Sequence, residues 1–190
     1  MKKIVLASGS PRRKQLLEWA EVDFDIIVVA THESFPEGLT TTQAAIHIAR
    51  QKALAVQACA TYRRYDQHVP VLAADTIVVC EGKIIGKPAD RDDAIRILHL
   101  LSGKKHEVIT GVAIINGKEE KTFADITEVW FHELTHEQIV FYTDRYKPYD
   151  KAGAYAIQEW IGVVGIARIN GDFYNVMGLP VSRVVREMGI

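Results

Sequence analysis

Hydrophobic and polar positions follow two periods along the chain, one typical of strands and one typical of helices. Apolar runs of strand length, rich in Val, Ile and Leu, occupy residues 4–7, 24–29 and 71–80. Apolar residues at helical spacing follow in residues 11–20, 41–60, 91–101 and from residue 180 onward. Strands that alternate with helices in this way predict a protein of the α/β class.

Two turn signals predict hairpins in the second half of the chain. Asn116-Gly117 joins two long strands predicted at residues 107–115 and 121–131. Thr135 to Gln138 has the pattern of a capping box and predicts the start of a helix. Asn170-Gly171 predicts a second tight turn, between a strand at residues 161–169 and its return at residues 173–176.

The composition excludes partners that need a strong charge. With 190 residues, 48% of them hydrophobic, the chain is long enough for one well-buried core. Its 23 basic and 24 acidic residues leave a net charge of −1, so no global field attracts nucleic acid or an anionic membrane. We therefore expect residues 1–190 to form a single domain, or two closely joined lobes, without a nucleic-acid partner.

No segment has the features of a signal peptide or a membrane span. The apolar stretch after Lys3 is shorter than the roughly 7–15 residues of a signal core, and no uncharged run approaches the roughly 20 residues needed to cross a bilayer. Cys59 and Cys80 lie among apolar neighbours, without C-x-x-C or metal-ligand spacing. We expect a cytoplasmic protein with two reduced thiols and no membrane contact.

Asp75 lies in the middle of the apolar run at residues 71–80. A buried carboxylate without a partner is costly, so such a residue normally has a cation, a metal ion or several hydrogen-bond donors beside it. An Asp that merely ends a strand is the commoner case, but here the apolar run resumes directly after Thr76. Asp75 is therefore the first candidate for chemistry.

A small-residue turn joins the first strand to the first helix. It contains Ser8, Ser10, Arg12 and Arg13, with Pro11 at the first helical position. Because a helix start presents free N–H groups and a positive dipole end, two arginines there are electrostatically misplaced unless an anion binds nearby. A capped surface helix with solvated arginines explains the pattern equally well, since the turn lacks the ending of a Walker loop.

Two lysines have positions that suit an anion site. Lys52 lies at the centre of the apolar stripe of the helix at residues 41–60, so its ammonium either extends to water or points into a site. Lys87 lies between Gly86 and Pro88, which present it on a stiff loop; an ordinary turn lysine looks the same.

Two further carboxylates accompany these cations. Glu33 follows a strand end, where α/β proteins place ligands, and Glu128 shares a strand face with apolar neighbours, although on an edge it would reach solvent. Carboxylate and phosphate oxygens are what Mg²⁺ prefers, and neither zinc spacing among the histidines nor a Ser-His-Asp pattern is visible. These residues favour a metal-assisted phosphoryl or nucleotidyl hydrolase.

The sequence resembles the Maf family of nucleoside triphosphate pyrophosphatases over nearly its whole length. The motifs that carry this resemblance are L-A-S-G-S-P-R-R from Leu6, Q-K-A from Gln51, A-D-T from Ala74, G-K-P from Gly86, L-S-G from Leu101, T-G at Thr110, T-E-V from Thr127, D-K-A-G-A-Y from Asp150 and N-V-M-G-L-P from Asn175. Each motif is weak alone, but their combination in this order is highly specific.

The resemblance implies hydrolysis of a nucleoside triphosphate to the monophosphate and pyrophosphate, a house-cleaning of nucleotide pools. It implies that Asp75 is the ionised proton acceptor and that Lys52 and Lys87 take part in catalysis. The substrate-binding residues would be Ser8, Ser10 and Arg13. Mg²⁺, or another divalent ion such as Mn²⁺, would be held by Glu33 and Asp75, with Glu128 as a further candidate ligand.

Three residues match the subgroup that resembles dTTP/UTP pyrophosphatases, namely Arg12, Thr76 and Gln158. A side-chain amide such as that of Gln158 can satisfy both the N3–H and a carbonyl of a pyrimidine. A 7-methyl-GTP pyrophosphatase is the alternative among enzymes. A nucleotide-responsive inhibitor of septum formation is the alternative outside enzymes, and turnover by an Asp75→Asn variant separates the two classes.

The resemblance also implies a fold and an assembly. The fold would be an elongated, twisted mixed sheet flanked by helices, with two lobes around a cleft, similar to inosine triphosphate pyrophosphatase. Relatives of this kind commonly form homodimers, so we expect a homodimer that binds a nucleoside triphosphate.

Overall fold

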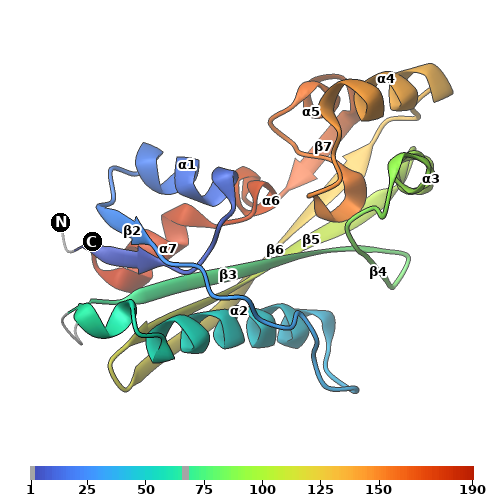
Figure 1. The fold of residues 1–190 in the computed structure, drawn as a ribbon. Helices are drawn as coiled ribbons and strands as arrows, with labels where there is room; N and C mark the ends of the chain where they lie inside the picture. The colour runs from blue at the N-terminus through green and yellow to red at the C-terminus, as the bar shows by residue number, and fades with distance from the viewer. Residues whose placement is uncertain (1–2, 66–68) are drawn as a thin grey trace. The chain divides into compact units, whose positions relative to one another are not determined.

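A mixed β-sheet flanked by helices forms the framework of the protein in a computed structural model, which describes residues 3–65 and 69–190. Within this part of the chain the sheet has seven strands in the order β2-β1-β3-β5-β6-β7, and β4 pairs with β3 (Figure 1). β1 pairs in parallel with β2 and β3, whereas β4 on β3 and β7 on β6 are antiparallel. The predicted α/β class with a mixed sheet is confirmed.

The elements have the following bounds. The strands are β1 (Ile4–Leu6), β2 (Phe24–Ile26), β3 (Val71–Cys80), β4 (Lys83–Ile85), β5 (Lys105–Asn116), β6 (Glu119–Phe131) and β7 (Ile166–Asn170). The α-helices are α1 (Pro11–Trp19), α2 (Thr41–Ala58), α3 (Arg91–Leu101), α4 (His136–Tyr146), α5 (Trp160–Gly165), α6 (Phe173–Met177) and α7 (Val181–Met188). Two 3₁₀ turns, η1 (Tyr62–Arg64) and η2 (Ala152–Ala154), complete the described elements.

The chain divides into two compact units, each built from segments that are not continuous in sequence. Unit 1 contains residues 1–75, 110–125 and 178–190, and unit 2 contains residues 76–109 and 126–177. Asp75 is therefore the last residue of its segment in unit 1, and Thr76 begins unit 2.

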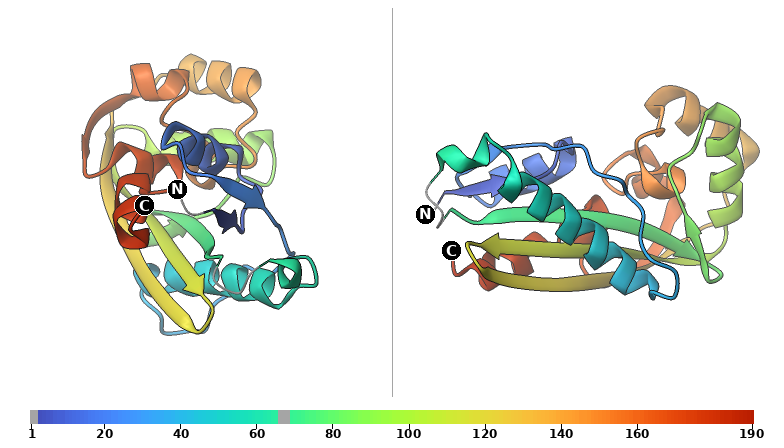
Figure 2. Two further views of the ribbon diagram at one scale, coloured as in Figure 1. Left: turned by 90° about the vertical axis from the view of Figure 1, so that its left-hand side faces the viewer. Right: turned by 60° about the horizontal axis from the view of Figure 1, so that its bottom comes forward.

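In unit 1, α2 covers one face of the sheet, while α1 and α7 lie on the other face (Figure 1). Figure 2 shows the same arrangement from two other sides. The side chains under α2 come from β1, β3 and β5, and include Val5, Val71, Ala73 and Ala113. Because side chains alternate along a strand, Asp75 points to the same face as Val71 and Ala73, which is the face that α2 covers.

Gly111 allows α2 to lie close against the sheet. A Cβ atom added at this position would lie 2.3 Å from the carbonyl carbon of Ala45 in α2. No larger residue fits such an approach without moving the helix. The Thr110-Gly111 motif therefore sets the height of α2, and of its side chains, above β5.

In unit 2, α3 packs against α4, and η2 packs against α3. Helix α3 begins as predicted, with the Asp90 side chain accepting a hydrogen bond from the Asp93 backbone N–H at 2.9 Å. The predicted capping box of α4 is also present, since Thr135 and Gln138 bond to each other's backbone N–H groups. Both caps satisfy N–H groups that a helix start leaves without partners.

The hairpin predicted around Asn170-Gly171 is wrong. Residues 160–165 form helix α5, only residues 166–170 form a strand, and residues 173–177 form the short helix α6. Helix α5 buries Ile161 and Gly165, which are one helical turn apart, and the Asp172 side chain accepts a bond from the Tyr174 N–H at the start of α6. Local capping and packing therefore override the strand pattern there.

Two smaller expectations concern the cysteines and membrane spans. Cys59 and Cys80 are both free thiols, as predicted. Among the helices of residues 3–65 and 69–190, none combines the length and the apolar character that a bilayer crossing requires.

Candidate functional site

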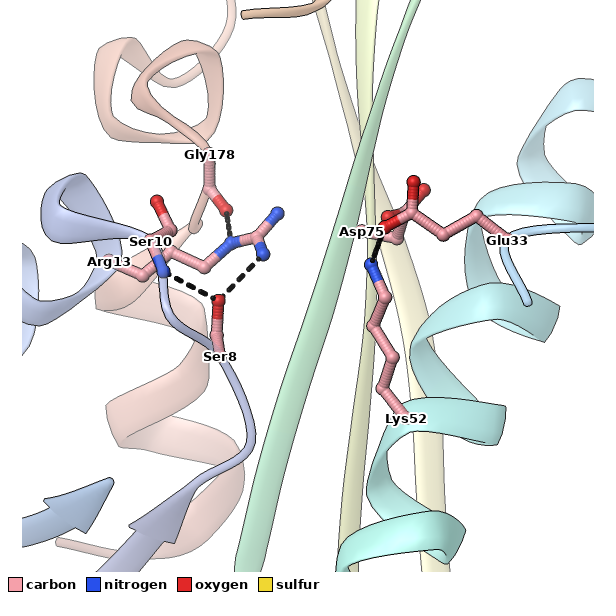
Figure 3. A network of polar contacts seen from close by, with 7 residues as sticks. All are labelled: Ser8, Ser10, Arg13, Glu33, Lys52, Asp75 and Gly178. Atoms are coloured by element: carbon pink, nitrogen blue, oxygen red, sulfur yellow. Dashed lines mark hydrogen bonds and ion pairs between the residues drawn. The ribbon is translucent and has the colours of Figure 1, made fainter. Parts of the chain in front are cut away.

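A polar cluster in unit 1 gathers side chains from the β1–α1 turn, the loop before α2, α2 itself and β3 (Figure 3). It contains six of the residues predicted from the sequence, namely Ser8, Ser10, Arg13, Glu33, Lys52 and Asp75. These residues span 68 positions of the sequence. They lie close together because β1 and β3 are neighbouring parallel strands and α2 lies on them.

Ser8 and Arg13 form a buried hydrogen-bonded pair at the start of α1. The Arg13 Nη1 atom donates to Ser8 Oγ at 3.1 Å, and the Ser10 backbone N–H donates to the same oxygen at 3.3 Å. Ser10 occupies the N-cap position, as predicted, but its side chain makes no capping bond. The turn is therefore organised around the Ser8 hydroxyl.

The Arg13 guanidinium is held from a second side by the chain near the C-terminus. Its Nε atom donates to the carbonyl oxygen of Gly178 at 2.8 Å, across 165 positions of sequence. Gly178 has a φ of +116°, a conformation that favours glycine. Two fixed bonds aim the guanidinium away from α1 toward β3 (Figure 3).

Burial lowers the pKa of Arg13. Desolvation lowers the pKa of the guanidinium, while the charges of Asp75 and Glu33 raise that pKa and the charge of Arg12 lowers it. An arginine nevertheless stays charged in proteins. Arg13 is therefore a buried cation that is stabilised by nearby anionic groups instead of by water.

Lys52 joins the two carboxylates of the cluster. Its Nζ atom lies 2.7 Å from Asp75 Oδ1 and 2.7 Å from Glu33 Oε1. The side chains of Lys52 and Asp75 are only 16% and 13% exposed, while that of Glu33 is 49% exposed. Of the two possibilities for Lys52, the ammonium therefore points into a polar site rather than along the helix surface to water.

The pair Glu33 and Asp75 has the donor chemistry of a hard divalent cation. Within the described residues, no group of three or more His, Cys, Asp or Glu side chains is placed to hold a metal ion. Mg²⁺ does not need such a group, because it is usually held by one or two carboxylates together with waters and substrate phosphates. The two carboxylates already converge on one cation, the Lys52 ammonium, so their placement fits such an ion.

Four of the predicted site residues belong to unit 2. Thr76 follows Asp75 directly on β3, and Gln158 is exposed at the end of the loop before α5. Lys87 is exposed in the loop after β4, where the carbonyl of the preceding Gly86 accepts a hydrogen bond from the Gly153 N–H at 3.1 Å. Arg12, the third residue of the predicted base-selective set, lies in the first turn of α1 in unit 1.

Glu128, the fourth of these residues, is engaged within unit 2. Its Oε1 atom accepts from Lys105 Nζ at 2.7 Å and its Oε2 atom from Asn170 Nδ2 at 3.0 Å. The Lys105 bond, followed by the Asn170 bond, lowers the pKa of this carboxyl. The contact with Asn170 follows from the register of the sheet, in which Glu128 pairs with Asn170.

Two residues of interest were not predicted from the sequence. Gly178 has no side chain to suggest a role, and its carbonyl contact with Arg13 depends entirely on the fold. Tyr142 is fully buried in α4, and the one available signal is its place on the apolar stripe, where a buried tyrosine hydroxyl needs a hydrogen-bond partner.

Comparisons with known proteins agree with each other. A family described as "Maf-like protein" matches residues 3–189. A dTTP/UTP pyrophosphatase of Cytophaga hutchinsonii is 48% identical over 97% of this chain and 82% of that protein. Proteins of the same name from Bacteroides fragilis strain YCH46 and Bacillus cereus strain G9842 are 46% and 48% identical, over 98% and 99% of this chain and 94% and 95% of theirs.

Among solved structures, the chain is similar to that described as "The structure of the Staphylococcus aureus Ham1 protein". The two share 17% sequence identity with a TM-score of 0.42, over 68% of this chain and 72% of the other.

Proposed function

The chain belongs to the Maf family, and we propose that it hydrolyses dTTP and UTP, or modified forms of them, to the monophosphate and pyrophosphate. Relatives that carry the name dTTP/UTP pyrophosphatase are 46–48% identical to it over nearly its full length. The structural observation that carries the proposal is the position of the Lys52 ammonium between Asp75 and Glu33 in the cluster that also contains Arg13 and Ser8.

In this mechanism Asp75 is the general base. Its carboxylate takes a proton from the attacking water, the water oxygen bonds to the α-phosphorus, and the bond between the α-phosphorus and the bridging oxygen breaks to release pyrophosphate. The bond from Lys52 fixes the orientation of the carboxylate. Burial of both side chains keeps the base from turning to bulk water.

Glu33 and Asp75 would hold a divalent cation, which we propose to be Mg²⁺. Glu128, the third ligand that the resemblance implies, already accepts hydrogen bonds from Lys105 and Asn170. When bound, such an ion supplies positive charge that balances the charge of the reacting phosphates. The protein's own contribution is to hold two carboxylates at one point through a single lysine. Mn²⁺ has similar preferences for oxygen ligands and is the natural substitute.

Ser8, Ser10, Arg13 and Lys87 would bind the triphosphate. Arg13 is suited to this task because two hydrogen bonds to the protein fix its plane, and a planar guanidinium can bond two phosphate oxygens at once. Its desolvation supplies the driving force, since an anion restores the solvation that burial removes.

Arg12, Thr76 and Gln158 would select the nucleobase. The Gln158 amide offers one acceptor and two donors, which complement the N3–H and the adjacent carbonyl of uracil and thymine. Cytosine presents the reverse pattern of donor and acceptor, so the site discriminates against CTP when the amide is held in one orientation. We also expect the protein to be a cytoplasmic homodimer. Light scattering during size-exclusion chromatography tests its oligomeric state.

The proposal is tested with a panel of triphosphates: dTTP, UTP, CTP, GTP, ATP and 7-methyl-GTP, each with Mg²⁺. We expect release of pyrophosphate and the monophosphate, with the highest kcat/KM for dTTP and UTP. Preference for 7-methyl-GTP would move the protein to the other enzyme subgroup. Release of inorganic phosphate and a diphosphate, or no turnover of any compound, would contradict the proposed function.

A further inference from the structure

Gln158 is exposed, yet the chain that presents it is tightly held. The five residues before it, from Gly153 to Ile157, are all buried. The Glu159 N–H after it donates to the Ala156 carbonyl at 3.1 Å, which closes a turn around Gln158. An exposed side chain on such a turn has a fixed backbone under it, which is what selective recognition requires.

The hydroxyl of Tyr142 bonds to the loop on both sides of Gln158. It accepts a hydrogen bond from the Ala156 backbone N–H at 3.1 Å, and it donates to Oε2 of Glu159. Tyr142 itself is fully buried in α4, and its ring stacks on that of Tyr146 with the ring centres 4.9 Å apart. One hydroxyl on a rigid helix thus connects the two flanks of the Gln158 turn.

The Glu159 carboxylate is held from a second direction by a buried lysine. Its Oε1 atom lies 3.6 Å from Lys151 Nζ, and the same ammonium lies 2.8 Å from Asp150 Oδ1. The Lys151 side chain is only 10% exposed. Both oxygens of Glu159 therefore have partners, so the carboxylate next to Gln158 is a structural anchor of the loop.

The start of the loop is fixed as well. Gly153 has a φ of +72°, and an added Cβ would lie 3.1 Å from Val78 Cγ2 on β3. Its N–H donates to the Gly86 carbonyl, next to Lys87. The loop that ends in Gln158 is thus secured at its beginning by backbone contacts and at its end by Tyr142.

We propose that Tyr142 is a positioning residue for Gln158 and thereby determines how strongly the enzyme selects uracil and thymine. This inference rests on the proposed function. A single amide discriminates between pyrimidines only when both its oxygen and its nitrogen meet the correct atoms of the base, and small displacements of a recognition group reduce such selectivity sharply. Tyr142 keeps the backbone of Gln158 in one place through its bonds to Ala156 and Glu159.

The test is the ratio of kcat/KM for UTP to that for CTP in a Tyr142→Phe variant. This change removes the hydroxyl and leaves the ring. We expect the ratio to fall about tenfold, as the loss of one buried hydrogen-bonding group predicts, while kcat for UTP at saturation stays within about threefold. Tyr146→Phe is the matched control, because the Tyr146 hydroxyl makes no hydrogen bond to the residues that the structure describes, and it should leave the ratio unchanged.

A double-mutant cycle shows whether Tyr142 acts through Gln158. In a Gln158→Leu background, Tyr142→Phe should change the ratio by less than about twofold, because the recognition group is already absent. A fall of the ratio by the same factor in both backgrounds would overturn the inference. So would a Tyr142→Phe variant that melts at a lower temperature but keeps the full ratio, since Tyr142 would then only stabilise the fold.

Changes of Glu159 test the same contact from the other side and do not depend on how well Tyr142→Phe folds. Glu159→Gln keeps an oxygen that can accept the Tyr142 hydroxyl and should retain the ratio, whereas Glu159→Ala should lower it. Equal ratios in these two variants would overturn the inference. If the wild-type enzyme does not prefer UTP to CTP, the proposed function itself fails, and that result is distinct from a preference that the variants leave intact.

Discussion

Two clusters of the protein contain the same chemical groups in different balance. In unit 1, the Lys52 ammonium lies 2.7 Å from both Asp75 and Glu33. In unit 2, the Lys105 ammonium lies 2.7 Å from Glu128, whose second oxygen accepts from the amide of Asn170. Distances alone do not distinguish the two clusters.

The two clusters differ in the number of carboxylates that share the ammonium and in burial. In the unit 1 cluster two carboxylates share one ammonium, and the side chains of Asp75 and Lys52 are only 13% and 16% exposed. The unit 2 cluster has one carboxylate for one ammonium, at side chains that are 30% and 46% exposed. A divalent cation gains most where two carboxylates converge and screening is weak. The comparison therefore supports the proposal that Asp75 takes part in the chemistry, whereas the contacts of Glu128 are those of a more exposed ion pair.

The largest effect is expected from Asp75→Asn. The amide keeps the size of the side chain but cannot accept the proton of the attacking water, so kcat for dTTP should fall about a thousandfold. Nucleotide binding by equilibrium dialysis and the melting temperature should stay close to those of the wild type. Wild-type turnover in this variant would show that the general base lies elsewhere.

The second largest effect is expected on the stability of the fold, which should fall at acidic pH because of the buried residue His106. His106, beside Lys105 on β5, is 1% exposed and hydrogen-bonded to the Tyr155 hydroxyl at 2.7 Å. Burial lowers its pKa from 6.5 to about 4. In the unfolded chain this histidine therefore takes up a proton near pH 6.5, whereas in the folded protein it does so only near pH 4.

The sign follows from this difference in proton binding. The contribution of His106 to stability is complete above pH 6.5 and is lost as the pH falls toward 4, by on the order of 3 kcal/mol for a shift of this size. Urea unfolding at pH 7.0 and 4.5 should show this loss in the wild type and a clearly smaller loss in His106→Gln. Identical pH dependence in the two proteins would show that His106 is not the buried titrating group.

Glu33→Gln tests the more exposed of the two carboxylates in the unit 1 cluster. Removing one negative charge should raise the Mg²⁺ concentration needed for half-maximal activity by about tenfold, because a carboxylate binds this hard cation much better than an amide does. Activity at saturating Mg²⁺ should largely recover. An unchanged Mg²⁺ dependence would remove Glu33 from the metal site.

Glu128→Gln is the matched change in the other cluster and should have the smallest effect. We expect the Mg²⁺ dependence of activity to shift by less than about threefold, since exposed ion pairs contribute little. Because the pKa of Glu128 is lowered, any stabilisation from its bond to Lys105 is present at neutral pH and is lost as the pH falls through that lowered pKa. A shift as large as that of Glu33→Gln would make Glu128 a metal ligand after all.

Much of the site could be predicted because its residues violate local rules. Asp75 in an apolar strand, Lys52 on an apolar helical stripe and arginines at a helix start all conflict with burial or with the helix dipole. Such conflicts are expected at functional positions. The direction of Lys52 could not be predicted, because it depends on which strands α2 covers.

Other features depend on contacts that no local pattern encodes. The bond from Arg13 to the Gly178 carbonyl spans 165 positions, and the two bonds of Tyr142 depend on how α4 packs on a loop. The error at residues 160–177 has a related cause, since short apolar segments fit a strand or a single helical turn equally well. Ile161 and Gly165 are buried together only once the helix packs in unit 2.

The central claim is that water attacks the α-phosphorus of a pyrimidine triphosphate under general-base catalysis by Asp75. Hydrolysis of dTTP in water enriched in ¹⁸O, followed by mass spectrometry of both products, tests this claim directly. We predict one ¹⁸O atom in the monophosphate and none in the pyrophosphate. Label in the pyrophosphate would place the attack on the β-phosphorus and contradict the account.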